Sequence, residues 1–314
     1  MDKKAIIEKV KKISPKFKEI GEKSFSMNGL ETNTLVFEYE GSEFVFVEGK
    51  DNVELGWDYN DDLGNSITEY MKNYSIGYYD YLLQVEKDIT EDYTKEIEKA
   101  IKNNESEEDI QQIRDDLEDE LEFNNEEKEL YENPDLFVEK FKTYLNECTS
   151  PVRKANIKSM LVETDNQYLK KAMTYDEVIE ELNKTIFRLP TEDEWEYICS
   201  GGKRTIFRWG NIFNEDLDDE ISPIGTGKCK DKNEFETIID KPNMFGVYIS
   251  YNPYKYEIID DETYLKGGDG GCSICGGDGP LYVLPCFSSF YRYKKTYNTF
   301  DENYYTIRRV VSLD

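Results

Sequence analysis

Apolar residues near the start of the chain follow two different periods. The first period is the spacing of one helix face. It predicts a short amphipathic helix followed by a polar turn, and both lie in an N-terminal helical segment over residues 1–33. From Thr34 the apolar residues gather in two β-rich runs on either side of residues 40–42, which predicts a hairpin or meander. The positions at helical spacing are Ile6, Ile7, Val10 and Ile13.

Helical periodicity returns in a strongly acidic stretch. Residues 86–132 carry 20 acidic and 6 basic side chains, a net charge of −14, which is half of the −28 of the whole chain. This pattern predicts a solvated helical insertion at about 86–147, with a specific docking surface as the alternative. The apolar positions at helical spacing are Ile110, Ile113, Leu117 and Leu121.

Two further helices are predicted by their N-terminal capping signals. Thr174 is followed three residues later by Glu177, and Thr191 by Glu194, and each pair precedes apolar residues. The hydroxyl and the carboxylate of such a capping box satisfy two backbone N–H groups at the helix start. After Gly201 the chain is rich in Gly, Asn and Tyr, which favours loops and short strands.

Composition excludes several function classes. The 314 residues include no histidine, which rules out Ser-His-Asp and Cys-His catalysis and histidine-bound zinc or iron. The net charge of −28 disfavours nucleic acids and anionic membranes as partners. No run approaches the roughly 18 apolar residues of a membrane span, and the N-terminus lacks the apolar core of a signal peptide. We therefore expect a cytoplasmic protein whose six cysteines are thiols or ligands.

The string FRLPTEDEWEY at residues 187–197, with Gly201-Gly202 and FRWGN at 207–211, resembles the signature of the formylglycine-generating enzyme (sulfatase-modifying factor) family. Shorter matches lie in the same order on both sides of it. The resemblance covers about residues 35–314. It implies an irregular α+β fold related to C-type lectins, in one domain over 34–314 that the acidic insertion interrupts. It also implies that ligands bind to loops of the C-terminal half. The residues of the string themselves favour a core helix, anchored by Trp195, over a catalytic role.

The most unusual stretch is glycine-rich. Residues 267–279 contain seven glycines, a density that suits tight turns or a backbone close to a ligand. In the resembled family two cysteines near this point hold copper(I). Cys272 falls on the first position, whereas Gly277 stands at the second, and Cys275 and Cys286 are possible substitutes. Cys272 and Cys275 are thus candidate catalytic residues, with inert thiols and a metal or redox site as the other interpretations.

Further candidate site residues come from the resemblance and from the composition of two C-terminal segments, the glycine-rich stretch and the Tyr- and Ser-rich segment at 288–293. Asn252 and Glu257 lie where the family holds calcium, and their oxygens are suitable hard ligands. The candidate ligand-binding residues are Asp269, Gly270, Gly271, Ser288, Tyr291 and Arg292. The competing interpretations are that Asp269 and Asp278 cap turns and that the Tyr- and Ser-rich segment is a buried aromatic cluster.

Two function classes remain open. The first is a divergent, non-catalytic binding or accessory module for a peptide or protein ligand. The alternative is a copper-dependent oxidase that converts a peptide cysteine to formylglycine through Cys272 and Cys275. A related iron-dependent sulfoxide synthase is excluded because the chain has no histidine.

Overall fold

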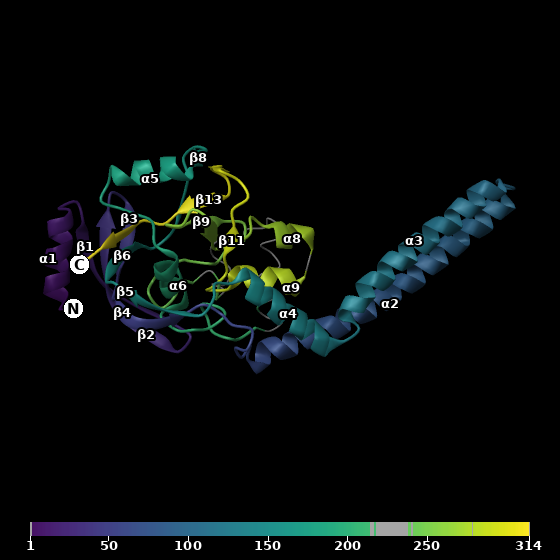
Figure 1. Ribbon diagram of the computed structural model, residues 1–314, viewed down its shortest axis with the longest axis horizontal. Helices are drawn as coiled ribbons and strands as arrows, with labels where there is room; N and C mark the ends of the chain where they lie inside the picture. Colours follow the sequence, from purple (N-terminus) through teal and green to yellow (C-terminus); the bar gives the residue numbers. More distant parts are fainter. Residues whose placement is uncertain (1, 214–216, 218–237, 240, 278, 314) are drawn as a thin grey trace. The chain divides into compact units, whose positions relative to one another are not determined.

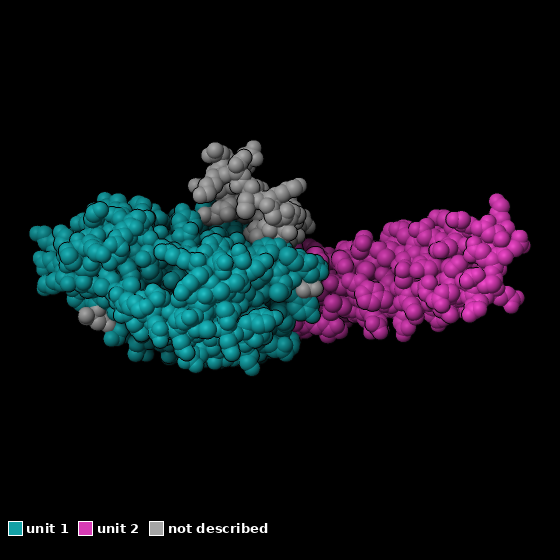
Figure 2. All heavy atoms as spheres, turned by 90° about the horizontal axis from the view of Figure 1, so that it is seen from above, with its two compact units in different colours: residues 1–64, 143–314 teal, residues 65–142 magenta. Residues whose placement is uncertain are grey.

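The computed structural model describes residues 2–213, 217, 238–239, 241–277 and 279–313 (Figure 1). They form two compact units, coloured separately in Figure 2. One unit comprises residues 1–64 and 143–314, and the other comprises residues 65–142. Both helices and antiparallel sheets are present, as expected for an α+β protein.

Strands from both ends of the larger unit build a five-stranded antiparallel sheet. Helix α1 (Lys3–Ile13) forms as predicted and buries Ile6 and Val10. The expectation of a helical segment up to residue 33 is wrong, because residues 18–27 pair with the next strand over nearly their whole length. The order of the sheet is β1 (Lys18–Met27), β2 (Leu30–Tyr39), β3 (Ser42–Val47), β6 (Met160–Glu163) and β14 (Val310–Ser312).

The predicted hairpin after Thr34 is the β2–β3 pair. Its strands pair from Tyr39 opposite Ser42 to Val36 opposite Val45. The turn between them places Glu40 at φ 49° and Gly41 at φ 91°. Two consecutive residues with positive φ match the twist of the flanking strands, which is why a glycine stands in this turn.

The C-terminal half forms a second five-stranded sheet, within which β9 and β13 run parallel. Its order is β11 (Tyr293–Lys294), β10 (Tyr264–Lys266), β9 (Tyr256–Ile258), β13 (Tyr305–Ile307) and β7 (Gln167–Tyr168). Two small sheets pair β4 (Lys50–Leu55) with β5 (Arg153–Ile157) and β8 (Met173–Thr174) with β12 (Thr299–Phe300). Three short helical segments follow the glycines: α8 (Cys272–Gly276), α9 (Pro280–Val283) and the 3₁₀ turn η1 (Leu284–Phe287).

Both predicted capping boxes are confirmed. Thr174 begins α5 (Tyr175–Asn183), and Thr191 begins α6 (Glu192–Ser200), with both reciprocal hydrogen bonds made in each case. Trp195 of α6 is fully buried. Arg188 donates two hydrogen bonds to the Glu194 carboxylate, at 2.6 and 2.7 Å. The FRLPTEDEWEY string is therefore a core helix with its own ion pair.

The smaller unit is helical. It contains α2 (Asn65–Lys102), α3 (Glu107–Tyr131) and the start of α4 (Pro134–Cys148). The Lys128 ammonium lies 2.5 Å from the Glu86 carboxylate, so α2 and α3 lie side by side. The helical structure begins at Asn65, well before the acidic stretch. Within the described ranges, no helix combines the length and apolar character that a membrane crossing needs.

Candidate functional site

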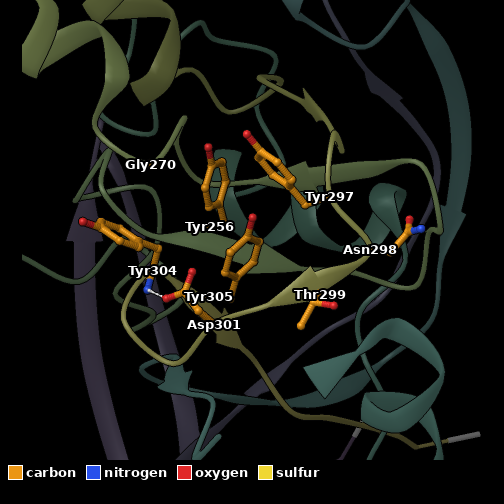
Figure 3. Close-up of a pocket in the computed structure, with 8 residues that line it drawn as sticks. All are labelled: Tyr256, Gly270, Tyr297, Asn298, Thr299, Asp301, Tyr304 and Tyr305. Carbon is orange, nitrogen blue, oxygen red and sulfur yellow. Dashed lines mark hydrogen bonds between the residues drawn. The ribbon is translucent and has the colours of Figure 1, made fainter. Parts of the chain in front are cut away.

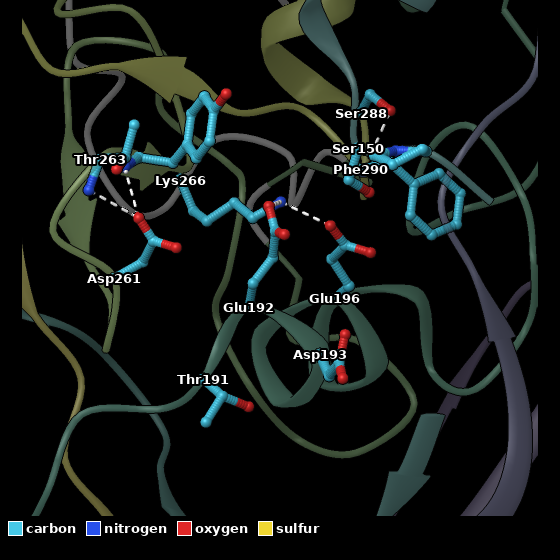
Figure 4. A network of polar contacts seen from close by, with 12 residues as sticks. Ser150, Thr191, Glu192, Asp193, Glu196, Asp261, Thr263, Lys266, Ser288 and Phe290 are labelled. Atoms are coloured by element: carbon cyan, nitrogen blue, oxygen red, sulfur yellow. Dashed lines mark hydrogen bonds and ion pairs between the residues drawn. The ribbon is translucent and has the colours of Figure 1, made fainter. Parts of the chain in front are cut away.

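The glycine-rich segment begins at a buried ion cluster. The Lys266 ammonium of β10 lies 2.6 Å from Glu196 and 3.0 Å from Glu192, both on α6, and Lys266 and Glu196 are fully buried (Figure 4). Burial raises the pKa of Glu196, although the charges of Lys266 and Arg153 act in the opposite direction. Burial also opposes ionisation of Glu192, but Lys266 and Arg153 more than offset this and lower its pKa. These ion pairs attach Lys266, the residue directly before the glycine-rich segment, to α6.

From there the loop backbone packs directly against residues 253–256. A Cβ on Gly268 would lie 2.2 Å from the Pro253 carbonyl oxygen, and one on Gly271 would lie 2.1 Å from the Tyr254 ring. Gly270 has φ +76°, and its Cβ would lie 2.7 Å from the Tyr256 hydroxyl oxygen. The glycines are therefore required by a close approach of the chain to itself.

Asp269 organises the next turn. One carboxylate oxygen accepts from the Gly271 backbone N–H at 2.9 Å, and the other accepts from the Ser273 N–H and hydroxyl at 2.9 and 2.5 Å. Asp269 is buried, and these hydrogen bonds are the turn-capping bonds that the competing interpretation predicts. Gly271 meets Tyr254 and does not line the pocket described below. Asp278 lies outside the described residues.

The two candidate catalytic cysteines lie on one turn of α8. Cys272 and Cys275 are both exposed. The Cys275 Sγ lies 3.2 Å from the Tyr254 hydroxyl. This contact, together with burial, raises the pKa of Tyr254 to about 12. The two thiols are thus accessible to solvent, and soft thiolate ligands suit copper(I).

The remaining described cysteines lie deeper. Cys199 and Cys286 are buried, and Cys148 is half-buried. Burial raises the pKa of the Cys148 and Cys199 thiols to about 12, and that of Cys286 well above its usual range. No disulfide joins the cysteines of the described ranges. The buried thiols are consequently poor nucleophiles, and Cys229 lies outside these ranges.

Of the three other predicted ligand-binding residues, two are buried and Arg292 is half-buried. Ser288 and Tyr291 are almost completely buried, and the Ser288 hydroxyl accepts from the Phe290 N–H at 3.2 Å. The Arg292 guanidinium stacks over the Tyr264 ring, 4.4 Å from its centroid. The burial of Ser288 and Tyr291 agrees with the alternative interpretation, in which this Tyr- and Ser-rich segment is a buried aromatic cluster.

The predicted calcium ligands do not fit a calcium ion. Asn252 and Glu257 line one small cavity of about 10 Å³, which is enough for one water molecule. Glu257 is held by Arg308 at 2.8 Å, and the Lys255 ammonium enters the same cavity. Over the described part of the chain, no three Cys, Asp or Glu side chains gather to hold a metal ion. Two cations of the chain itself, Arg308 and Lys255, thus act on Glu257, and their charge disfavours a further cation at this point.

A larger cavity opens beside Gly270. Its volume is about 430 Å³, a size suited to a small ligand or one amino-acid side chain (Figure 3). Four tyrosines dominate its wall, and Gly270 is the one predicted ligand-binding residue that contributes to it. The lining residues are Tyr256, Gly270, Tyr297, Asn298, Thr299, Asp301, Tyr304 and Tyr305. We call this cavity the tyrosine pocket.

The floor of the tyrosine pocket is buried, whereas its rim is exposed. Tyr256 and Tyr305 come from the parallel strands β9 and β13, are each 8% exposed and stack at 4.9 Å between ring centroids. The Tyr256 hydroxyl also donates to the Asp269 carbonyl oxygen at 2.6 Å. At the rim, Tyr297 is 71% exposed and Tyr304 is 45% exposed. Buried and exposed aromatic rings thus form one continuous surface.

The sequence contained a signal for this pocket. Four of its five aromatic and acidic lining residues lie within residues 297–305, the string YNTFDENYY. Tyrosine beside Asn, Thr and Asp, in a region without helical period, is a common composition of binding loops. The cysteines and glycines, which carry the more unusual pattern, did not point to this string.

Comparisons with protein-family models, with curated proteins and with solved structures found no match.

Proposed function

We propose that this protein is a non-catalytic binding module, and that the tyrosine pocket receives a segment of a peptide or protein ligand. The observation that carries the proposal is the combination of an anchored aromatic floor with strongly exposed aromatic rings at the rim. Large apolar groups gathered on a surface mark interaction sites. Tyrosine supplies contact area with little loss of side-chain entropy and is common in binding hot spots.

The chemistry of the other candidate sites supports the same choice. The chain has no histidine to act as a base near neutral pH. The buried carboxylates Glu196 and Glu257 are held in ion pairs with Lys266 and Arg308. These pairs stabilise the fold around the pocket and leave their charges unavailable for proton transfer to a ligand.

The proposal is tested by selecting ligands and then locating where they bind. Peptides are selected from a random library displayed on phage, using the full chain as bait. Their affinities are measured for Tyr297→Leu and Tyr304→Leu, with Tyr81→Leu as the matched control. Tyr81 is 58% exposed but belongs to the helical unit.

We expect each rim substitution to weaken the selected peptides roughly tenfold, the usual effect of an interface hot-spot tyrosine. The Tyr81 variant should bind like the wild type. Equal affinities for all variants would place binding elsewhere and overturn the proposal.

A second candidate function is favoured by one observation, the exposure of both Cys272 and Cys275 on a single turn of α8. Copper(I) bound there would supply oxidase chemistry on a peptide cysteine, and these two thiolates would be the residues that hold it. Titration of the reduced protein with copper(I) tests this. A copper-binding protein takes up one ion per chain and loses it in Cys272→Ser and in Cys275→Ser. A binding module takes up no stoichiometric copper and consumes no oxygen with a cysteine-containing peptide.

A further inference from the structure

The electrostatics of the tyrosine pocket identify the class of group that it receives. Among its lining residues the single charged side chain is Asp301. Its Oδ1 accepts from the backbone N–H groups of Asn303 and Tyr304, at 2.7 and 3.2 Å, which fixes the carboxylate beside the pocket. A carboxylate in this position disfavours anionic ligands and attracts cationic ones.

The aromatic wall favours the same sign of charge. The faces of tyrosine rings are negative, so they attract a cation that approaches within about 6 Å of the ring centroid. In Figure 3 the rings of Tyr256, Tyr297 and Tyr305 stand close together, with Asp301 on the neighbouring turn. A wall of this kind binds best a cation whose charge is spread over alkyl groups, because such an ion gives up little hydration.

The same unit already uses its rings in this way. The Lys295 ammonium lies 4.6 Å from the Tyr175 ring centroid and 5.4 Å from that of Phe300, which follows Thr299 of the pocket. The Lys255 ammonium lies 5.0 Å from the Tyr168 ring centroid. Lysine ammonium groups of this unit thus lie within cation–π distance of aromatic rings. The lining of the tyrosine pocket itself includes no lysine or arginine.

We propose that the tyrosine pocket binds an organic cation, an alkylated ammonium group, held by the tyrosine faces and the Asp301 carboxylate. The inference rests on the proposed function, since it names the chemistry of the ligand at the same site. Two sources share this chemistry: a free quaternary ammonium compound and a lysine side chain, methylated or not, on a peptide.

The test compares ligands of the same shape with and without charge. Choline and its neutral carbon analogue 3,3-dimethylbutan-1-ol are titrated into the full chain and followed by NMR. We expect choline to bind about tenfold more tightly than the alcohol, the combined effect of ring faces and one carboxylate. Capped tripeptides with lysine, trimethyllysine or norleucine at the centre form the second arm. Tighter binding of the two lysine peptides than of choline identifies a peptide as the source, and the reverse order identifies a free compound.

Two variants with matched controls locate the cation. Asp301→Asn keeps the Oδ1 acceptor of the turn but removes the charge, and it should weaken choline roughly three- to tenfold. The control is Asp261→Asn, because Asp261 accepts from Thr263 and Tyr264 in the same way but lies outside the pocket. Tyr297→Leu should weaken choline by a similar factor, while Tyr81→Leu should not change its affinity.

The outcomes separate this inference from the proposed function. If choline and its neutral analogue bind equally, or if neither binds up to tens of millimolar, the cation preference is wrong. The proposed function still stands in that case, provided that the selected peptides lose affinity in the Tyr297 and Tyr304 variants. If those peptides are insensitive to both variants, the pocket itself is not the binding site and both proposals fail.

Discussion

The Tyr256 hydroxyl donates a hydrogen bond to the backbone carbonyl of Asp269, with 2.6 Å between the two oxygens. This bond joins the floor of the tyrosine pocket to the glycine-rich loop, since Tyr256 lies on β9 and Asp269 lies in the loop that caps α8. The glycine-rich loop and the floor of the pocket are therefore joined by a direct hydrogen bond.

Tyr256→Phe tests this connection. The substitution keeps the ring stacked on Tyr305 and removes the hydroxyl, so a buried bond is lost without a change of shape. We expect a loss of roughly 1–2 kcal/mol in the free energy of unfolding. Amide hydrogen exchange should also become faster between residues 269 and 273. Unchanged exchange in that segment would mean that the bond does not hold the loop.

Gly270→Ala tests the close approach of the loop backbone at Gly270 to the Tyr256 side chain. Gly270 and Gly277 both have positive φ, +76° and +72°, but only Gly270 has a neighbour within reach, the Tyr256 ring and hydroxyl. Gly277→Ala should therefore cost roughly 1–2 kcal/mol of stability, from backbone strain alone. Gly270→Ala should cost more and should also weaken pocket ligands. Urea unfolding of the two variants measures the difference, and equal losses would show that the space beside Gly270 is not limiting.

The core helix of the FRLPTEDEWEY string is tested at Trp195. Trp195→Ala should destabilise the protein by roughly 3–5 kcal/mol, because the side chain is fully buried. The indole N–H of Trp195 has no hydrogen-bond partner among the described atoms, so Trp195→Phe removes no bond and should cost much less. Thermal unfolding followed by circular dichroism gives both values. A loss below about 1 kcal/mol in the alanine variant would place Trp195 at the surface.

Replacing Lys266 should produce a pH-dependent loss of stability. Lys266→Met leaves Glu196 buried with Arg153 as its remaining cation, at 3.1 Å, which should cost roughly 3–5 kcal/mol near neutral pH. Burial raises the folded-state pKa of Glu196, so the folded protein holds this proton more tightly than the unfolded chain does. Stability from this group is therefore greatest below about pH 4.3, the ordinary glutamate value, and is lost as the pH rises through the folded pKa.

The stability lost in Lys266→Met should become smaller as the pH is lowered from 8 towards 5, because the Glu196 carboxylate then takes up a proton. Lys184→Met is the control, because Lys184 pairs with Glu181 at the surface at a similar distance of 2.7 Å. It should show no such pH dependence. A constant difference between Lys266→Met and the wild type across this range would contradict the assignment.

Local signals in the sequence predicted local structure well. The capping boxes at Thr174 and Thr191, the β2–β3 hairpin and the burial of Trp195 each depend on residues close together in the chain, and all are confirmed. The strand β1 was missed because its alternating polar residues carry little apolar signal and its pairing partner decides its structure.

The site was harder to predict, because it depends on packing between distant segments. The glycines at 268 and 270 indicated a close approach, but only the fold shows that the approach is to Pro253 and Tyr256. Glu257 has the chemistry of a calcium ligand, but its partner proves to be Arg308, fifty-one residues away in sequence. The sequence shows which chemical groups the chain contains, but it does not show which side chains contact one another in the fold.

The most direct test of the tyrosine pocket as the binding site is hydrogen exchange measured by mass spectrometry on the full chain, with and without a saturating selected peptide. A ligand in the pocket should slow exchange in residues 297–305 and around Gly270, and it should leave α2 and α3 unchanged. Protection confined to α2 and α3, or to the Cys272–Cys275 turn alone, would contradict the central claim.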